Sequence, residues 1–270
     1  MNSRDITVAA IQTMLHWEGK AANLEHFGRL MEKLEEPVDL LVLPEMFTTG
    51  FSMNPAKLAE PMEGPTLDWM REKASWLNAV VTGSFIVAEN GKFYNRLLWV
   101  RPDGSYDYYS KRHLFRMAGE DKFYDFGHAK IFPQLFGWKI CPLICYDLRF
   151  PVWCRNQWKL TADTWTPDFD VQIFVANWPE RRAHAWKTLL MARAIENLSY
   201  VVGLNRIGND GNFIFHSGES AFIDFKGEVM KSAVFSTEEV ITTRLSYQLL
   251  MEYRQSFPAG LDADSFYIAH

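Results

Sequence analysis

A run of apolar residues at positions 138–144, WKICPLI, passes directly into the polar turn CYDLRFP, and this junction restricts the fold more than any other stretch of the chain. Ile140, Leu143 and Ile144 are typical of a parallel sheet whose two faces are both covered. The run therefore predicts a buried strand that ends at Cys145. A sharp turn there would present the thiol to a cleft beside free backbone N–H groups, as in a nucleophile elbow. A small core residue is the alternative, because free cysteines are among the most buried residue types.

A second buried strand is predicted over residues 39–43, DLLVL, after a strand at 6–11 and an amphipathic helix at 21–35. A short strand–helix–strand crossover of this kind implies parallel pairing. Glu45 follows the second strand almost directly, at the edge where α/β sheets place their ligands. A solvated loop acid is the alternative, because glutamate is usually exposed.

The remaining apolar runs and turn signals predict one domain over residues 1–270, with no repeat, low-complexity tract or linker. Two halves of similar β-α-β content favour an α/β fold in which two sheets pack together with helices outside. One predicted strand ends at Lys111, so three strand ends supply Glu45, Lys111 and Cys145. We expect helices at 67–77 and 185–198, strands at 80–88, 93–101, 106–110, 171–176, 200–204 and 240–245, a hairpin over 213–230, and no clear period from Tyr247 onward.

Charge and cysteine content argue against several classes of partner. The 270 residues carry a net charge of -5 without a basic stripe, so we expect no nucleic-acid partner. No apolar run has the length of a transmembrane helix or a signal peptide, so we expect no membrane partner. Cys141 and Cys145 would lie roughly 13 Å apart on one strand, too far for a disulfide. No CxxC or HxxxH accompanies them, so we expect neither a metal nor a cofactor, and three unpaired thiols (Cys154 is the third) fit a reducing cytoplasm.

A carboxylate, an ammonium and a thiol at neighbouring strand ends form a complete set for acyl transfer from an amide to water. The thiolate is the nucleophile, and a nearby cation lowers the pKa of its thiol. The carboxylate can take the thiol proton and return it to a leaving amine. The ammonium can stabilise the oxyanion of a tetrahedral intermediate, together with the backbone N–H after the nucleophile. No histidine is required, and no histidine of this chain lies in a context that marks it as a general base.

With these residues in place, the chain resembles the nitrilase superfamily of carbon–nitrogen hydrolases over nearly its whole length. LVLPEMF around Glu45 is similar to the glutamate motif of that family, YSKRHLF around Lys111 to its lysine motif, and CYDLRFP around Cys145 to its cysteine motif. Three such motifs in the family's order are far more specific than one. The resemblance implies a four-layer αββα sandwich, paired into a homodimer or higher homo-oligomer through the sandwich faces.

The resemblance also implies the roles of the site residues. Glu45 would be the general base, Lys111 the oxyanion support and Cys145 the nucleophile, with the backbone N–H of Tyr146 completing the oxyanion hole. A second glutamate seven residues before a glycine often orders such sites, and Glu120 within GEDKFYDFG fits that spacing. A solvated loop acid is the alternative for Glu120.

Within the superfamily, three segments look most like the omega-amidase branch. They are CYDLRFPVW, NWP at residues 177–179 and ARAIEN at residues 192–197. That branch hydrolyses the terminal amide of small α-keto acid amides, such as α-ketoglutaramate and α-ketosuccinamate, to a dicarboxylate and ammonia. Val152 stands where the more widespread RFPEL wording has glutamate, which favours the microbial type. The rivals are another amide substrate, such as deaminated glutathione or an N-carbamoyl compound, and a non-catalytic relative that binds metabolites or proteins.

A small anionic substrate needs a cation near the thiol, and Arg149 in the elbow turn is the candidate, because a guanidinium can grip a carboxylate through two hydrogen bonds. A structural pair with an acid is the alternative for Arg149. Phe115, Trp178 and Trp186 are candidates for the pocket wall, although core packing is the usual role of aromatic side chains.

Overall fold

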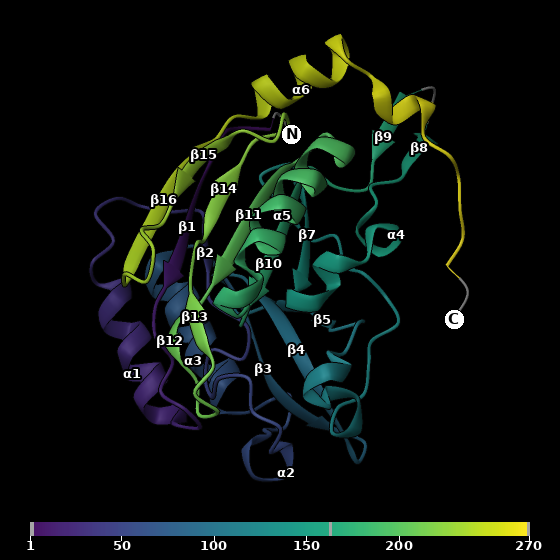
Figure 1. The fold of residues 1–270 in the computed structure, drawn as a ribbon. Coiled ribbons are helices and arrows are strands. Elements are labelled where there is room, and N and C mark those ends of the chain that lie inside the picture. Colours follow the sequence, from purple (N-terminus) through teal and green to yellow (C-terminus); the bar gives the residue numbers. More distant parts are fainter. Residues whose placement is uncertain (1–2, 162–163, 269–270) are drawn as a thin grey trace.

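Two six-stranded β-sheets lie face to face in the computed structural model of the chain, which describes residues 3–161 and 164–268 (Figure 1). The first sheet contains, in spatial order, Glu239–Leu245 (β16), Ile6–Gln12 (β1), Leu40–Val42 (β2), Val80–Glu89 (β3), Lys92–Val100 (β4) and Tyr106–Ser110 (β5). The second contains Val229–Ser232 (β15), Ala221–Ile223 (β14), Tyr200–Asn205 (β11), Val171–Ala176 (β10), Trp138–Ile144 (β7) and Gln134–Leu135 (β6).

Helices cover the outer face of each sheet. Helices α1 (Lys20–Met31) and α3 (Pro65–Leu77) pack on the first sheet, where Phe27 and Met70 join a buried cluster with Leu41. Helix α5 (Ala183–Asn197) packs on the second sheet, and its Leu190 leaves no room for a side chain at Gly203 of β11. The order of layers is therefore helix, sheet, sheet, helix, which is the αββα sandwich that the sequence predicts.

The alternation of side chains along the strands explains how the core is shared among these layers. Val8 and Val42 of the first sheet meet Leu143 of the second in the cluster between the sheets. Their neighbours Ala9 and Leu41 point the other way, into the helix-covered cluster. Strands buried on both faces need apolar residues at successive positions, which is why residues 40–43 and 140–144 read as continuous apolar runs.

Parallel pairing at the centre of each sheet gathers several strand ends at one edge. In the first sheet β1, β2 and β3 are parallel, and in the second β7, β10 and β11 are parallel. The carboxyl ends of β2, β7 and β10 lead to Glu45, Cys145 and Asn177. The fold therefore brings together side chains that lie far apart in the sequence.

The segment after residue 246, expected to lack a period, contains helix α6 (Tyr247–Ser256), which lies apart from the other helices in Figure 1. Ser246 caps its first turn by accepting a hydrogen bond from the Leu249 N–H. Only Leu250 and Arg254 are buried on it. Because the buried face is one residue wide per turn, the apolar periodicity was too weak to predict this helix.

The predicted hairpin over 213–230 is partly wrong. Its second half is correct, because β14 and β15 pair through a turn at residues 224–227. Its first half instead forms Phe215–Ser217 (β13), which pairs with Ile207–Asn209 (β12). Gly218 and Glu219 adopt positive φ angles of 76° and 59° and interrupt the run between β13 and β14.

The other predicted elements are present, with helix α1 ending at Met31 rather than at residue 35. The short elements that were not predicted include Pro55–Leu58 (α2), Pro151–Cys154 (α4), strand β6 and the hairpin strands Trp158–Thr161 (β8) and Thr164–Pro167 (β9). In the described ranges, no helix combines the length and the apolar character needed to cross a membrane.

Candidate active site

Cys145 sits at a strained corner between strand β7 and the 3-10 turn η3 (Cys145–Arg149). Its φ angle is +45°, a backbone conformation that few residues other than glycine adopt. The residue is 8% exposed and lines a cavity. This is the strand-to-turn geometry predicted for a nucleophile elbow.

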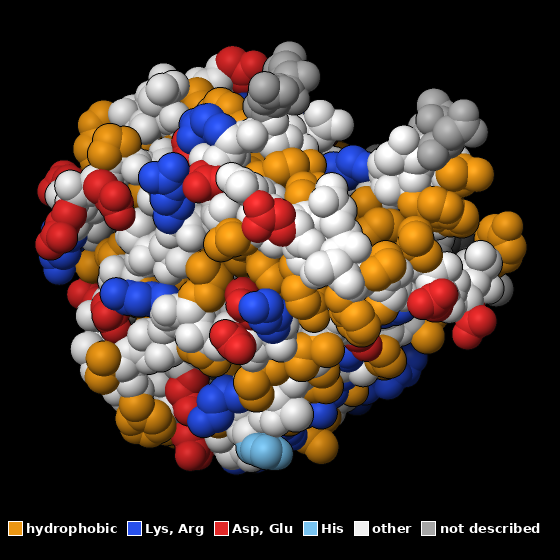
Figure 2. Space-filling model, turned by 90° about the horizontal axis from the view of Figure 1, so that it is seen from above, with side chains coloured by type: hydrophobic (Ala, Val, Ile, Leu, Met, Phe, Trp, Pro, Cys, Tyr) orange, Lys and Arg blue, Asp and Glu red, His pale blue; other side chains and the backbone are white. Residues whose placement is uncertain are grey.

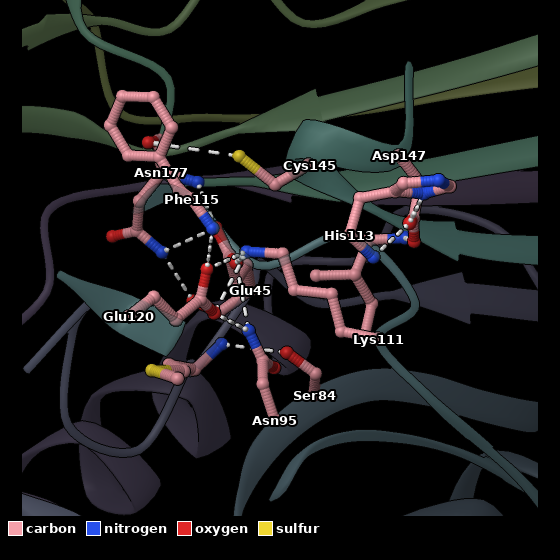
Figure 3. Close-up of polar contacts among 12 residues, drawn as sticks. Glu45, Ser84, Asn95, Lys111, His113, Phe115, Glu120, Cys145, Asp147 and Asn177 are labelled. Carbon is pink, nitrogen blue, oxygen red and sulfur yellow. Dashed lines mark hydrogen bonds and ion pairs between the residues drawn. The ribbon is translucent and has the colours of Figure 1, made fainter. Parts of the chain in front are cut away.

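Asp147 stabilises the turn at Cys145 through hydrogen bonds. Its carboxylate is fully buried and accepts hydrogen bonds from the Ile144 N–H at 3.1 Å and the Tyr109 hydroxyl at 2.7 Å. It also accepts one from the His113 N–H at 3.0 Å, and the His113 ring Nδ1 lies 2.8 Å away (Figure 3). The turn that carries Cys145 is thereby tied to the end of β5, where Lys111 lies.

Glu45 is fully buried and held by groups from both sheets (Figure 3). Its Oε1 accepts hydrogen bonds from Lys111 Nζ at 2.9 Å and Asn95 Nδ2 at 2.8 Å. Its Oε2 accepts one from the Asn177 N–H at 2.8 Å. The Cys145 Sγ lies 4.0 Å from the backbone oxygen of the same Asn177. A solvated loop position for Glu45 is therefore wrong.

Lys111 lies between two carboxylates with no exposed surface. Its Nζ donates to Glu45 Oε1 and to both oxygens of Glu120, at 3.0 and 2.9 Å. Glu120 Oε2 also accepts a hydrogen bond from the Phe115 N–H at 2.5 Å. The structure thus brings Glu120 to the predicted site and leaves no role for it as a solvated acid.

Burial and neighbouring charges set the protonation states of this cluster. Burial alone would lower the pKa of Lys111, but the carboxylates of Glu120 and Glu45 raise it above its ordinary value, so the ammonium stays charged. Burial, opposed by Lys111 and reinforced by Glu45, raises the pKa of Glu120. Burial and the negative charge of Glu45 raise the pKa of Cys145 well above its ordinary value. The resting thiol is therefore protonated, and it would need a proton acceptor in order to act as a nucleophile.

The cavity beside Cys145 is small and largely aromatic. It is lined by all four residues predicted to contact substrate and by others, namely Phe51, Phe115, Cys145, Tyr146, Arg149, Asn177, Trp178, Pro179 and Arg182. Trp186, the fifth candidate, does not line it. That side chain is fully buried in the core and packs against Trp178, with ring centroids 5.5 Å apart.

Arg149 lines the cavity, and among the residues that the structure describes it forms no ion pair with an acid. Its guanidinium carbon lies 4.9 Å from the ring centroid of Trp178. Five residues that line the cavity or bond Glu45 were not assigned from the sequence, namely Phe51, Asn95, Asn177, Pro179 and Arg182. Asn177 alone had a usable signal, because it follows a predicted strand directly.

The arrangement can carry out acyl transfer with the protein's own groups. A protonated thiol on a sharp turn lies beside a carboxylate that can accept its proton, and a permanently charged ammonium lies on the other side of that carboxylate. Within the described ranges, no three His, Cys, Asp or Glu side chains cluster in a way that could hold a metal ion.

Known proteins resemble the chain over nearly its full length. The sequence profile described as carbon-nitrogen hydrolase matches residues 7–255. The omega-amidase YafV of Escherichia coli is 42% identical, covering 97% of this chain and 98% of that protein. A 2-oxoglutaramate amidase of Bacillus subtilis is 31% identical, covering 93% of this chain and 95% of that protein.

A solved structure agrees with these sequence matches. A CN-hydrolase superfamily protein from Xanthomonas campestris, crystallised with an arsenic adduct in its active site, superposes with a TM-score of 0.95. It is 46% identical, and the match covers 100% of both chains. The chain therefore belongs to the carbon-nitrogen hydrolase family of the nitrilase superfamily.

Proposed function

We propose that this hydrolase is an omega-amidase that releases ammonia from the terminal amide of small α-keto acid amides through a thioester on Cys145. The observation that carries the proposal is the buried Glu45–Lys111–Glu120 cluster beside a thiol that opens into a cavity with a guanidinium at its wall. The similarity to proteins named omega-amidase and 2-oxoglutaramate amidase supports the substrate class.

In the first step Cys145 gives its proton to Glu45 as the sulfur attacks the amide carbon. The negative charge that develops on the amide oxygen is stabilised by the Lys111 ammonium and the Tyr146 backbone N–H, which lies in the first turn of η3. Glu45 then protonates the departing nitrogen, the carbon–nitrogen bond breaks, and ammonia leaves an acyl thioester on Cys145.

In the second step a water molecule gives a proton to Glu45 and attacks the thioester carbon. The carbon–sulfur bond breaks, the thiolate recovers its proton from Glu45, and the carboxylic acid leaves. Glu45 suits the role of base better than Glu120 does. The charge of Glu120 has a smaller effect on the Cys145 thiol, and both Glu120 oxygens bond Lys111. The charge of Glu45, by contrast, acts strongly on the Cys145 thiol.

Arg149 is the cation that we assign to the carboxylate at the far end of the substrate. It lines the cavity beside the thiol, and stacking on Trp178 leaves its N–H groups available for a ligand. Phe115, Trp178 and the ring of Tyr146 would form the walls around the carbon chain.

The test is ammonia release from α-ketoglutaramate, measured beside glutamine, an N-carbamoyl amino acid, deaminated glutathione and a simple nitrile. We expect kcat/KM to be highest for the keto-acid amide. Preference for deaminated glutathione or the carbamoyl compound would replace the omega-amidase assignment by that activity. Release from none of them would favour a non-catalytic, metabolite-binding relative.

We also propose that the protein acts in the cytoplasm as a homodimer or higher homo-oligomer. Three free, buried thiols support a reducing compartment. Figure 2 shows hydrophobic side chains gathered toward the side that bears the β8–β9 hairpin and the C-terminal segment. Leu160, Trp165 and Phe257 are exposed in this region, and contiguous exposed apolar surface is typical of a protein interface. Light scattering of the purified protein tests the assembly, and a monomeric mass would contradict it.

A further inference from the structure

The cavity beside Cys145 contains a second guanidinium that the mechanism above does not use. Arg149 and Arg182 both line this cavity, and the other lining residues are aromatic, apolar or uncharged polar groups apart from the thiol. Glu45 and Glu120, the acids of the site, are already bound to Lys111. In a chain with a net charge of -5, the space next to the nucleophile is therefore locally positive.

Both guanidiniums are held by stacking rather than by ion pairs. The Arg182 guanidinium carbon lies 5.3 Å from the ring centroid of Phe115, and that of Arg149 lies 4.9 Å from the ring centroid of Trp178. Neither arginine forms an ion pair within the described part of the chain. Stacking occupies the face of a guanidinium and leaves its edge N–H groups for a planar acceptor such as a carboxylate.

Arg182 lacks a satisfactory acceptor in the structure. Its Nη2 donates only to the Met117 sulfur at 2.7 Å, and a thioether is a weak acceptor. Its Nη1 is buried with no hydrogen-bond partner. Burial, Arg181 and Arg149 together lower the pKa of Arg182. A buried N–H without an acceptor is energetically unfavourable, and so is the repulsion between two neighbouring guanidiniums. An anion bound between Arg182 and Arg149 would relieve both.

The backbone holds Arg182 in place through the loop that also holds the general base. Arg182 ends the 3-10 turn η4 (Glu180–Arg182) and precedes helix α5. Its backbone oxygen accepts a hydrogen bond from Trp178 Nε1 at 2.9 Å. Asn177, one residue before Trp178, bonds Glu45. The position of Arg182 is thus fixed relative to Glu45 and Cys145 by a few residues of chain.

We propose that Arg182 and Arg149 together form a two-guanidinium clamp that selects amides bearing a carboxylate at their other end. This inference deepens the proposed function, on which it rests for the identity of the reaction. Arg182 is a specificity-determining residue in this arrangement, because it binds the end of the substrate that does not react.

The kinetic test compares two open-chain amides, succinamate and butanamide. Butanamide has a methyl group where succinamate has its carboxylate. We expect Arg182→Gln to lower kcat/KM for succinamate about ten- to a hundredfold, mainly through KM, and to leave butanamide unchanged. Arg182→Lys should restore part of the loss. Arg181→Gln, an exposed neighbour outside the cavity, is the matched control and should behave as wild type. If Arg182→Gln lowered kcat/KM equally for both amides, or for neither, the proposed clamp would be wrong.

A second measurement does not depend on turnover. Alkylation of Cys145 by the neutral reagent iodoacetamide is followed by peptide mass spectrometry, and we expect 2-oxoglutarate to slow it if the clamp binds a carboxylate of this ligand. We expect the concentration for half-protection to rise at least about tenfold in Arg182→Gln and Arg149→Gln but not in Arg181→Gln. Protection without hydrolysis of any keto-acid amide would refute the omega-amidase proposal and still support the clamp. No protection of wild type, or equal protection of Arg182→Gln, would refute the clamp itself.

Discussion

Asn177 holds Glu45 by three hydrogen bonds that cross from one sheet to the other, the longest from Asn177 Nδ2 to Glu45 Oε2 at 3.5 Å. The Asn177 N–H donates to Glu45 Oε2 at 2.8 Å, and Asn177 Nδ2 donates to the Glu45 backbone oxygen at 2.7 Å. Glu45 follows a strand of the first sheet and Asn177 a strand of the second, the sheet that carries Cys145. The distance between Glu45, the proposed base, and Cys145, the proposed nucleophile, is therefore set by the packing of the two sheets.

Asn177→Ala removes the two hydrogen bonds from the Asn177 side chain to Glu45 and keeps the one from its backbone N–H. We expect kcat to fall about tenfold or more, because Glu45 gains freedom to move, and the free energy of unfolding to fall by about 1–3 kcal/mol. Steady-state ammonia release and urea unfolding measure the two effects. The exposed Asn212→Ala is the control, and an unchanged kcat in Asn177→Ala would show that these bonds do not position the base.

Glu120→Gln keeps the shape of the side chain and removes one of the two charges that face Lys111. Because a buried ammonium then loses a partner, we expect about 3 kcal/mol of destabilisation and a strong drop in kcat. Asp121→Asn, next along the chain, breaks only a surface pair with Arg116 and should change stability by less than about 0.5 kcal/mol. Equal effects of the two substitutions would contradict a structural and electrostatic role for Glu120.

Gly127 is packed against the end of β5, next to Lys111. A Cβ at this position would lie 2.1 Å from the Ser110 backbone oxygen, and the Gly127 N–H donates to the Lys111 oxygen at 2.9 Å. We expect Gly127→Ala to displace Lys111, to cost about 3 kcal/mol and to reduce kcat. Gly28→Ala is the control, because its nearest neighbour lies at 4.0 Å and alanine favours a helix. Wild-type stability and kcat in Gly127→Ala would refute the prediction.

The buried thiols predict how stability depends on pH. Burial raises the pKa of Cys141 to about 12, whereas in the unfolded chain it is near 8.5. The folded state therefore keeps a proton that the unfolded state loses, and stability falls as pH rises above about 8.5 toward the folded value. Cys141→Ala should reduce this slope by up to about 1.4 kcal/mol per pH unit, as measured by urea unfolding at several alkaline pH values. An identical slope in wild type and variant would contradict the prediction.

Much of the fold could be predicted because the sandwich buries its central strands on both faces, which leaves continuous apolar runs before Glu45 and Cys145. Asn95 could not be predicted, since it lies within β4 and nothing local separates it from other strand positions. Phe51 and Arg182 reach the cavity through loop conformations that no periodicity encodes. Trp186 takes the alternative role considered for it, core packing, because an aromatic side chain near a motif packs in the core as readily as in a pocket.

The most direct test of the mechanism is to trap the thioester. Wild-type protein is mixed with α-ketoglutaramate, quenched in acid within the first turnovers and examined by intact and peptide mass spectrometry. The proposed mechanism predicts an adduct equal to the substrate less ammonia on the peptide that contains Cys145. Cys145→Ala should show neither adduct nor turnover and should remain folded, while Cys141→Ala should retain both adduct and turnover. Turnover by Cys145→Ala, or an adduct on any other residue, would contradict the central role of this thiol.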